Sequence, residues 1–159
     1  MNAQPNPDLP AGFSISIATW RDLNQVWVLE KLCFSKNDAW PYLDLLAALS
    51  FPGLVRYKLC KGQQLIGFVG GEIKAGVGWI TTIEVHPDYQ DRGFGKALLA
   101  RAERALNTTS IRLTTRKSNL EAIRLYEKTG YKPISLWKSY YIGGEDGLVF
   151  EKNLEVDKQ

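Results

Sequence analysis

The chain has 159 residues, of which 45% are hydrophobic and 23% charged, and its net charge is +3. The length suits about one domain, and the composition is that of an ordinary globular protein. A charge of this size does not by itself indicate nucleic-acid binding. No apolar run approaches the ~20 residues that cross a bilayer, and the start, MNAQPNPDLPAG, lacks the features of a secretory signal. We therefore expect a cytoplasmic protein that binds neither nucleic acid nor membrane.

The sequence contains few residues that could bind a metal or form a disulfide. Cys33 and Cys60 are the two cysteines, and His86 is the one histidine. Neither cysteine belongs to a C-x-x-C pair, and a chain of this size does not depend on a disulfide. We expect two free, buried thiols and no metal site.

Apolar periodicity divides the chain into elements in a simple order. Residues 1–12 contain three prolines and are expected to form a loose tail, with a single domain over 13–154. Strands are predicted over 13–17, 54–61, 64–73, 78–85, 110–115, 131–136 and 147–152. Helices are predicted over 20–33, 42–50, from the glycines at 93–95 to about 106, and from 118 or 119 to 130. On strand 78–85, alternation places Trp79, Thr81, Ile83 and Val85 on one face and Ile80, Thr82, Glu84 and His86 on the other.

A glycine loop follows strand 78–85, in the sequence HPDYQDRGFGKALL at residues 86–99. Gly93 and Gly95 lack a Cβ, so several backbone N–H groups can approach one ligand. The helix that begins here adds unpaired donors and a partial positive charge. Arg92 and Lys96 add full positive charges. The loop is therefore predicted to bind an anion, although an ordinary glycine turn has the same pattern.

The spacing excludes two familiar phosphate loops. A dinucleotide fingerprint needs a small residue where Leu98 stands, and a P-loop needs Ser or Thr where Ala97 stands. Further arginines follow the loop, at Arg101, Arg104, Arg112 and Arg116. Their clustering has two explanations: these arginines lie on solvated faces of a helix and a strand, or they bind a polyanionic small ligand.

A second motif lies in the helix predicted after strand 110–115. Tyr126 falls near the centre of the apolar face, so its ring is expected to point inward with a hydroxyl that needs a partner. Taken alone, Tyr126 is simply a core tyrosine and Asn119 a helix cap. Taken together, Q-x-x-G-x-G at 90–95 and S-N-x-x-A-x-x-L-Y-x-x-x-G-Y at 118–131 resemble the motifs of the GNAT superfamily of N-acetyltransferases. The segments 34–41 and 137–147 are similar to RimI-type protein N-terminal (ribosomal-protein alanine) acetyltransferases.

This resemblance implies a fold and an activity. The fold is α/β (α+β), a mixed twisted sheet of six to seven strands flanked by four helices, with strands 78–85 and 110–115 splayed apart. The activity is direct transfer of acetyl from acetyl-CoA to a primary amine, foremost a protein or peptide N-terminus. The residues implied to bind acetyl-CoA are Ile83, Val85, Gln90, Asp91, Arg92, Gly93, Phe94, Gly95, Lys96, Asn119 and Tyr126. Those implied for the acceptor are Trp40, Tyr140 and Tyr141, although core packing explains Trp40 equally well.

Proton transfer is where the sequence departs from the family pattern. Tyr126 corresponds to the tyrosine that protonates the departing thiolate. RimI-type enzymes carry a glutamate general base where this chain has Thr114, which cannot serve. Glu84 is the candidate base instead, because burial would raise its pKa toward a useful value. The alternatives are that Glu84 is a surface carboxylate, or that water relays the proton with no single base.

Three further alternatives remain open at this level. In the first, the acceptor is a small-molecule amine or an amino acid rather than a protein. The chain is a non-catalytic CoA-binding module that has lost proton transfer, which the retained Tyr126 disfavours. The third concerns the oligomeric state, which is a monomer or a homodimer.

Overall fold

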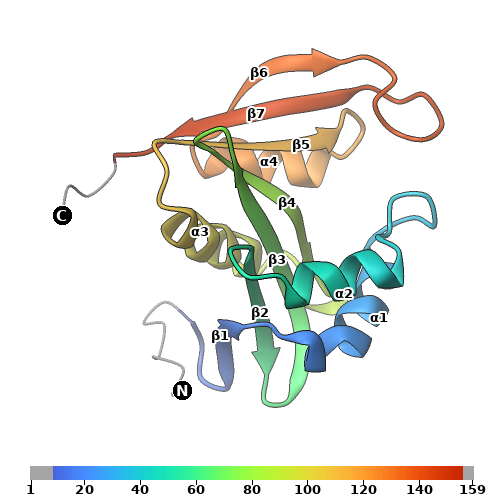
Figure 1. The fold of residues 1–159 in the computed structure, drawn as a ribbon, viewed down its shortest axis with the longest axis vertical. Helices are drawn as coiled ribbons and strands as arrows, with labels where there is room; N and C mark the ends of the chain where they lie inside the picture. The colour runs from blue at the N-terminus through green and yellow to red at the C-terminus, as the bar shows by residue number, and fades with distance from the viewer. Residues whose placement is uncertain (1–8, 156–159) are drawn as a thin grey trace.

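The computed structural model describes residues 9–155, which build one seven-stranded sheet with helices on both faces (Figure 1). The strands are β1 (Phe13–Ile17), β2 (Val55–Lys61), β3 (Gln64–Lys74), β4 (Val77–Val85), β5 (Ser110–Arg116), β6 (Lys132–Trp137) and β7 (Gly147–Asn153). The α-helices are α1 (Leu23–Cys33), α2 (Tyr42–Ser50), α3 (Phe94–Leu106) and α4 (Leu120–Lys128), and short 3-10 helices cover Trp20–Asp22 and Pro87–Tyr89. The predicted fold class is confirmed.

The strands follow the order β1-β2-β3-β4-β5-β7-β6. Neighbouring strands are antiparallel except β4 and β5, which are parallel. A parallel pair needs a crossover connection, and the glycine loop with α3 supplies it. Figure 1 shows β5, β7 and β6 at one end of the molecule, beyond the long strands β3 and β4.

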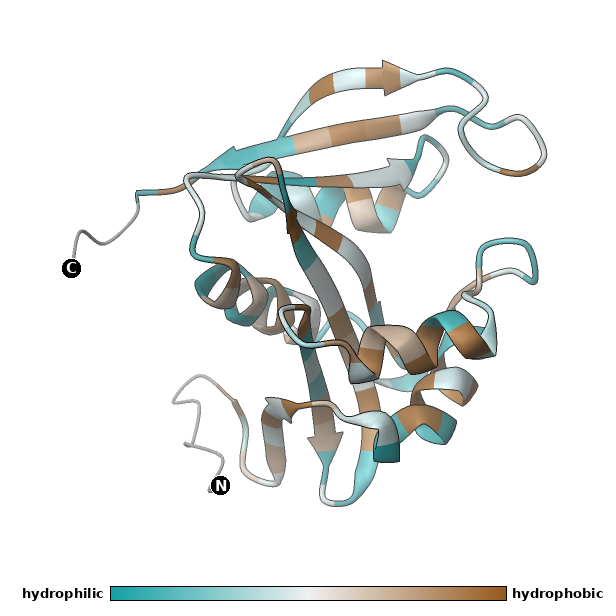
Figure 2. Cartoon of the chain, in the orientation of Figure 1, coloured by the Kyte–Doolittle hydropathy of each residue, from teal (hydrophilic) through white to brown (hydrophobic). Residues whose placement is uncertain are grey.

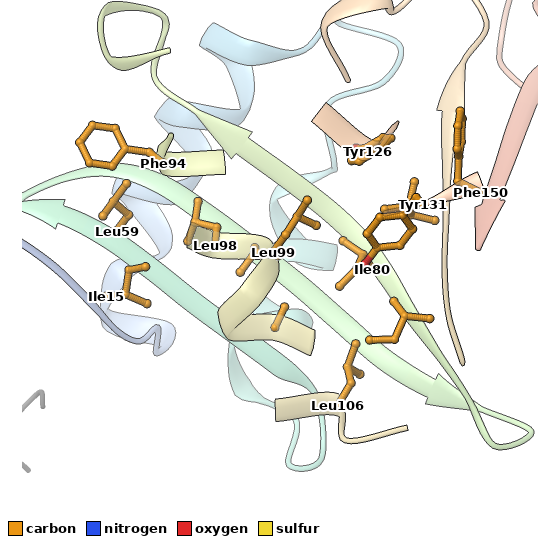
Figure 3. Close-up of a cluster of buried hydrophobic side chains, with 14 of the residues drawn as sticks. Ile15, Leu59, Ile80, Phe94, Leu98, Leu99, Leu106, Tyr126, Tyr131 and Phe150 are labelled. Carbon is orange, nitrogen blue, oxygen red and sulfur yellow. The ribbon is translucent and has the colours of Figure 1, made fainter. Parts of the chain in front are cut away.

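Two separate hydrophobic cores lie on the two faces of the sheet. On β3, Leu65 and Phe68 pack in the core formed by α1 and α2, whereas Ile66 and Val69 pack in the core with α3. Figure 2 shows apolar and hydrophilic residues alternating along α1 and α2, and the buried apolar residues of these helices pack with Leu65 and Phe68. Figure 3 shows the α3 leucines projecting onto the strands, with the rings of Tyr126, Tyr131 and Phe150 grouped beyond Ile80. The helices therefore hold the sheet from both sides.

The face prediction for strand 78–85 is wrong at one point, because β4 contains a β-bulge. Gly70 of β3 pairs with Thr82 but Gly71 pairs with Ile80, which leaves Thr81 as the extra residue. A bulge interrupts the alternation of side chains. As a result, Ile80 packs in the same core as Ile83 and Val85 rather than on the opposite face.

The described end of the predicted tail, residues 9–12, makes two backbone hydrogen bonds. Residues 1–8 of the expected tail lie outside the described residues. The Phe13 N–H donates to the Pro10 carbonyl at 3.2 Å, and the Gly62 N–H donates to the Gly12 carbonyl at 3.0 Å. The helix predicted over 20–33 begins as a 3-10 turn and becomes α-helical at Leu23. No helix in residues 9–155 is long and apolar enough to span a membrane.

The α3 core should dominate stability. Leu98 is fully buried at 0% exposure, so Leu98→Ala is expected to lower the free energy of unfolding by about 2–5 kcal/mol, measured by urea denaturation. Leu43→Ala on α2 is the control, because Leu43 is 73% exposed and should change stability by less than about 0.5 kcal/mol. Equal losses in the two variants would contradict the assignment of the core.

Candidate active site

The site begins where β4 and β5 separate. Backbone pairing between them covers only Gly78–Ile80 on β4 and Ile111–Leu113 on β5, although both strands continue. The His86 N–H donates to the Ile66 carbonyl of β3 at 2.7 Å. Because alternate residues of a strand direct their backbone groups to the same edge, those of Ile83 and Val85 point away from β3, into the gap. The predicted splaying is confirmed.

A cleft of about 170 Å³ occupies this gap. Its wall is formed by the loop between α1 and α2, the strands β4 and β5, one face of α4 with its N-cap, and the loop between β6 and β7. The lining residues are Phe34, Asp38, Trp40, Ile80, Thr81, Thr82, Ile83, Leu113, Thr114, Thr115, Arg116, Asn119, Ala122, Tyr126 and Tyr141. Of the residues predicted for the site, the cleft brings together Trp40, Ile83, Asn119, Tyr126 and Tyr141.

Tyr126 is a buried member of this wall. Its side chain is 5% exposed, and its ring packs against Tyr131 and Phe150 at centroid distances of 6.0 and 5.9 Å. Burial raises the pKa of its phenol well above the usual value, and the nearby Tyr141 adds to this. The hydroxyl therefore keeps its proton throughout the neutral pH range, as a proton donor requires.

Asn119 and the glycine loop form two helix N-termini on the same side of the sheet. The Asn119 side-chain oxygen accepts from the Ala122 N–H at 3.2 Å, which caps α4. Gly93 caps α3 with a positive φ of 82°, a conformation that favours glycine. A Cβ on Gly95 would lie 3.1 Å from the Leu125 side chain, so α3 and α4 touch here.

The loop suits an extended phosphate-bearing ligand. A Cβ on Gly93 would meet nothing within 4 Å, so the N-terminus of α3 is open on that side. The Gln90 side-chain amide donates to the Val85 carbonyl at 3.0 Å, which fixes the loop against the end of β4. Residues 90–96 lie beyond the cleft lining and continue from its β4 wall. The open N-terminus of α3 and the adjoining cleft are therefore chemically suited to a long ligand with an anionic end.

Arg116 links the two loops at the mouth of the cleft. Its guanidinium donates to both carboxylate oxygens of Asp38 at 2.5 and 2.6 Å and to Glu145 at 3.3 Å. It also lies 4.6 Å from the centre of the Tyr141 ring. These hydrogen bonds lower the pKa of Asp38 below its usual value. Asp38 belongs to the loop after α1 and Glu145 to the loop before β7. Arg116 therefore fixes the distance between these two loops.

The predicted acceptor aromatics are not equivalent. Tyr141 lines the cleft, and burial raises the pKa of its phenol to about 12. Tyr140 is outside the lining and 53% exposed; its ring contacts Tyr141 and Trp137 at 5.0 Å from each. Trp40 lines both the cleft and a second cavity of about 220 Å³ between α2 and the sheet.

Glu84 is buried, but its carboxyl group lies behind the cleft wall rather than in it. The residue is 4% exposed and faces Glu30 of α1, which is 0% exposed. Burial, followed by the charge of Glu30, raises the pKa of Glu84 well above its usual value. Burial also raises the pKa of Glu30, although the Trp40 N–H, which donates to it at 3.1 Å, opposes this.

Cys33 borders the same carboxyl pair. Both cysteines are free thiols; Cys60 is buried and Cys33 is half-buried. The Cys33 thiol donates to the Val85 carbonyl at 3.3 Å. Burial and the two carboxyl groups raise its pKa to about 12, so it stays a neutral thiol.

The suggestion of a polyanionic ligand for the whole arginine cluster needs correction. Arg116 is committed to Asp38 and Glu145, and Arg112 to Glu151 at 2.6 Å. Arg101 lies 4.2 Å from the centre of the Tyr57 ring. Three of these arginines therefore have partners within the protein. Arg92 and Lys96, at the glycine loop, are exposed.

Comparison with known proteins agrees with this geometry. Residues 20–131 match the model of the Acetyltransferase (GNAT) family. An N-alpha-acetyltransferase of Saccharolobus solfataricus is 26% identical over 89% of this chain and 93% of its own. The [ribosomal protein bS18]-alanine N-acetyltransferase of Salmonella typhimurium is 28% identical over 86% and 94%. The crystal structure of the ribosomal-protein-S18-alanine N-acetyltransferase from Escherichia coli has a TM-score of 0.81 and 23% identity, over 92% and 97% of the two chains.

A splayed strand pair with a glycine loop at the following helix defines an acetyl-CoA-dependent acyltransferase site. The chain belongs to the GNAT acetyltransferase family, whose model matches most of its length. It is an acetyl-CoA-dependent N-acetyltransferase of RimI-like type.

Among the residues that sequence reasoning did not assign to the site are the polar ones Glu30, Asp38, Thr82 and Arg116. Glu30 carried a usable signal, since it occupies an apolar position of the α1 periodicity and a charge at such a position is rarely fully buried. Asp38 and Arg116 carried none, because nothing local indicates that a loop and the end of β5 will meet.

Arg116 is expected to order both loops at the cleft mouth. Arg116→Met keeps the side-chain stem but removes the bonds to Asp38 and Glu145, so amide hydrogen exchange in residues 35–41 and 138–146 should accelerate about tenfold. Arg112→Met is the matched control, because its partner Glu151 lies on β7, away from these loops. The same acceleration in both variants would refute a specific role for Arg116.

Proposed function

We propose that the protein acetylates the α-amino group of a protein or peptide N-terminus. The observation that carries this proposal is the cleft itself, which has Tyr126 in its wall and opens between two loops joined by Arg116. A mouth bordered by two loops accepts an extended chain end as well as its amine. The relatives described above include enzymes named for acetylating an N-terminal alanine or α-amine.

The acetyl donor would be held by the backbone of β4 and by the glycine loop. The backbone groups of Ile83 and the N–H of Val85 face the gap and suit the amides of the pantetheine arm, whereas the Val85 carbonyl already accepts from Gln90 and Cys33. The diphosphate would meet the N–H groups at the start of α3 and the charges of Arg92 and Lys96. The loop residues proposed for this role are Gln90, Asp91, Arg92, Gly93, Phe94, Gly95 and Lys96. Asn119 lies on the opposite wall, at the start of α4.

Two proton movements accompany transfer. Acetyl-CoA, when bound, supplies the activated acetyl group. Tyr126 holds a proton at its phenol oxygen and donates it to the departing sulfur, since its raised pKa keeps it protonated. The acceptor ammonium must also lose a proton before it can attack. Glu84 is proposed to serve this step through its neighbours, because its carboxyl group does not line the cleft.

On the acceptor side, Trp40 and Tyr141 are proposed to contact the chain end, because both line the cleft. Tyr140 is proposed to act from the rim, where it supports Tyr141 by an edge contact at 5.0 Å.

The activity is tested by thiol release from acetyl-CoA with a panel of N-terminal peptides, polyamines, aminoglycosides and free amino acids. We expect the highest turnover with peptides, and mass spectrometry should place the acetyl group on the α-amine. Release with small amines but no peptide would reassign the acceptor. Release with no amine, together with tight acetyl-CoA binding, would indicate a CoA-binding module.

Tyr126→Phe should separate chemistry from binding. Loss of the proton donor is expected to lower kcat about a hundredfold, with the KM for acetyl-CoA within about twofold of the original. Tyr131→Phe is the control: it removes another buried hydroxyl, which donates to Glu103 at 2.9 Å and lies outside the cleft. If both variants keep full turnover, Tyr126 is not the proton donor.

Gly93→Ala should weaken acetyl-CoA binding. Gly93 and Gly53 have matching φ angles of +82° and +83° with open space around a Cβ, so alanine costs about 1–2 kcal/mol of backbone strain at either position. Only Gly93 lies at the start of α3. Its substitution should raise the Kd for acetyl-CoA about tenfold by calorimetry, whereas Gly53→Ala should leave it unchanged. Equal affinities would remove the loop from the binding site.

A further inference from the structure

The cleft wall itself contains no usable proton acceptor. Thr114 stands in it without a carboxyl group, and the phenols of Tyr126 and Tyr141 are held neutral. Asp38 is the one carboxylate among the lining residues, and both of its oxygens accept hydrogen bonds from Arg116. A carboxylate stabilised in this way has a lowered affinity for protons. The acceptor of the amine's proton must therefore be sought behind the wall.

Behind the wall lie the side chains of Glu30 and Glu84. They are 0% and 4% exposed, and neither takes part in an ion pair within residues 9–155. Both oxygens of Glu84 and Oε1 of Glu30 receive no hydrogen bond from other residues. Two adjacent carboxylates cannot both remain charged in such surroundings. The pair is stable when one carboxyl group is protonated and donates to the other.

The surroundings decide which carboxyl group carries the charge. Glu30 receives the Trp40 N–H at Oε2 and lies beside the Thr82 hydroxyl, and both contacts favour its charged form. Glu84 has only Glu30 as a partner, and that contact favours its neutral form. The neutral Cys33 thiol of α1 is the other titratable group that borders the pair. Glu30 is thus the carboxylate and Glu84 the acid.

Glu30 is also the member nearer to the cleft. Its two polar neighbours, Trp40 and Thr82, are both residues of the cleft wall. The Thr82 hydroxyl can accept a proton from the cleft while donating its own to Glu30. Thr82 therefore lies between the cleft and the buried carboxylate of Glu30.

We propose that Glu30 and Glu84 share one proton, and that Glu30 takes up the proton of the acceptor ammonium through the Thr82 hydroxyl. This proposal deepens the N-acetyltransferase function and rests on it. As the C–N bond forms and the C–S bond breaks, the nitrogen loses two protons: one passes to the pair, whose charge goes from −1 to 0, and the other reprotonates Tyr126, which has given its own proton to the departing sulfur. The pair then returns its proton to solvent. Glu84 is a positioning residue, because it acts through Glu30.

Three variants separate the roles within the pair. Glu30→Gln keeps the shape and should lower kcat about a hundredfold, with the KM for acetyl-CoA unchanged. Glu84→Gln should lower kcat less than Glu30→Gln does, because its amide still donates to Glu30. Glu84→Leu removes that donor, so the acid limb of the kcat/KM profile should move to higher pH by about one unit. Glu151→Gln, which removes a carboxyl group on β7, is the matched control and should behave as the original protein.

A spectroscopic measurement tests the shared proton independently of activity. At pH 7 the infrared spectrum should contain the band of a buried protonated carboxylic acid, and Glu84→Gln should abolish it. Absence of the band, or a Glu30→Gln variant with the original kcat and pH profile, would overturn the proposal. A larger loss in Glu84→Gln than in Glu30→Gln would assign the charge to Glu84 and overturn it as well. If the unchanged protein acetylates no peptide, the proposed function is wrong, and so is proton uptake by Glu30 from the acceptor. The infrared band then still shows whether Glu30 and Glu84 share a proton.

Discussion

The separation of β4 from β5 is the constraint on which the rest of the site depends. Two parallel strands that remained paired would satisfy each other's backbone groups and leave no space between them. Here pairing stops at Ile80, next to the bulge at Thr81, and backbone groups of Ile83 and Val85 face the gap. The cores on both faces of the sheet hold the strands in this arrangement, because β4 packs against α1 on one side and α3 on the other. The cleft is thus built into the sheet rather than added by loops.

The second feature is the placement of charge around that cleft. The carboxylate at its surface, Asp38, is used to hold Arg116, while the two carboxyl groups without a counter-charge lie behind Thr82 and Trp40. A buried, unpaired carboxyl pair destabilises a protein. Its presence beside a cleft whose one carboxylate is bound to Arg116 is explained if the pair takes up the proton that the reaction releases.

Much of the site could be predicted from short stretches of sequence. The glycine loop and the helix around Tyr126 have characteristic spacings, and the structure places Asn119 as a helix cap and Tyr126 in the cleft wall. The prediction failed where register mattered. Strict alternation placed Ile80 on the wrong face, because a single extra residue at Thr81 reverses the pattern and no composition signal marks it. Arg116 was misjudged for a related reason: its partners lie in two loops distant in sequence.

The family and the mixed sheet with four helices could be predicted from the sequence, which also indicated candidate residues for acetyl-CoA. These follow from local periodicity and from motifs confined to residues 79–132. Only the tertiary structure decided that Glu84 lies against Glu30, that Asp38 is neutralised by Arg116, and that Tyr141 rather than Tyr140 lines the cleft. Each of these facts depends on contact between elements far apart in the chain. Such contacts set burial and charge pairing, and therefore proton affinity, which residue spacing does not encode.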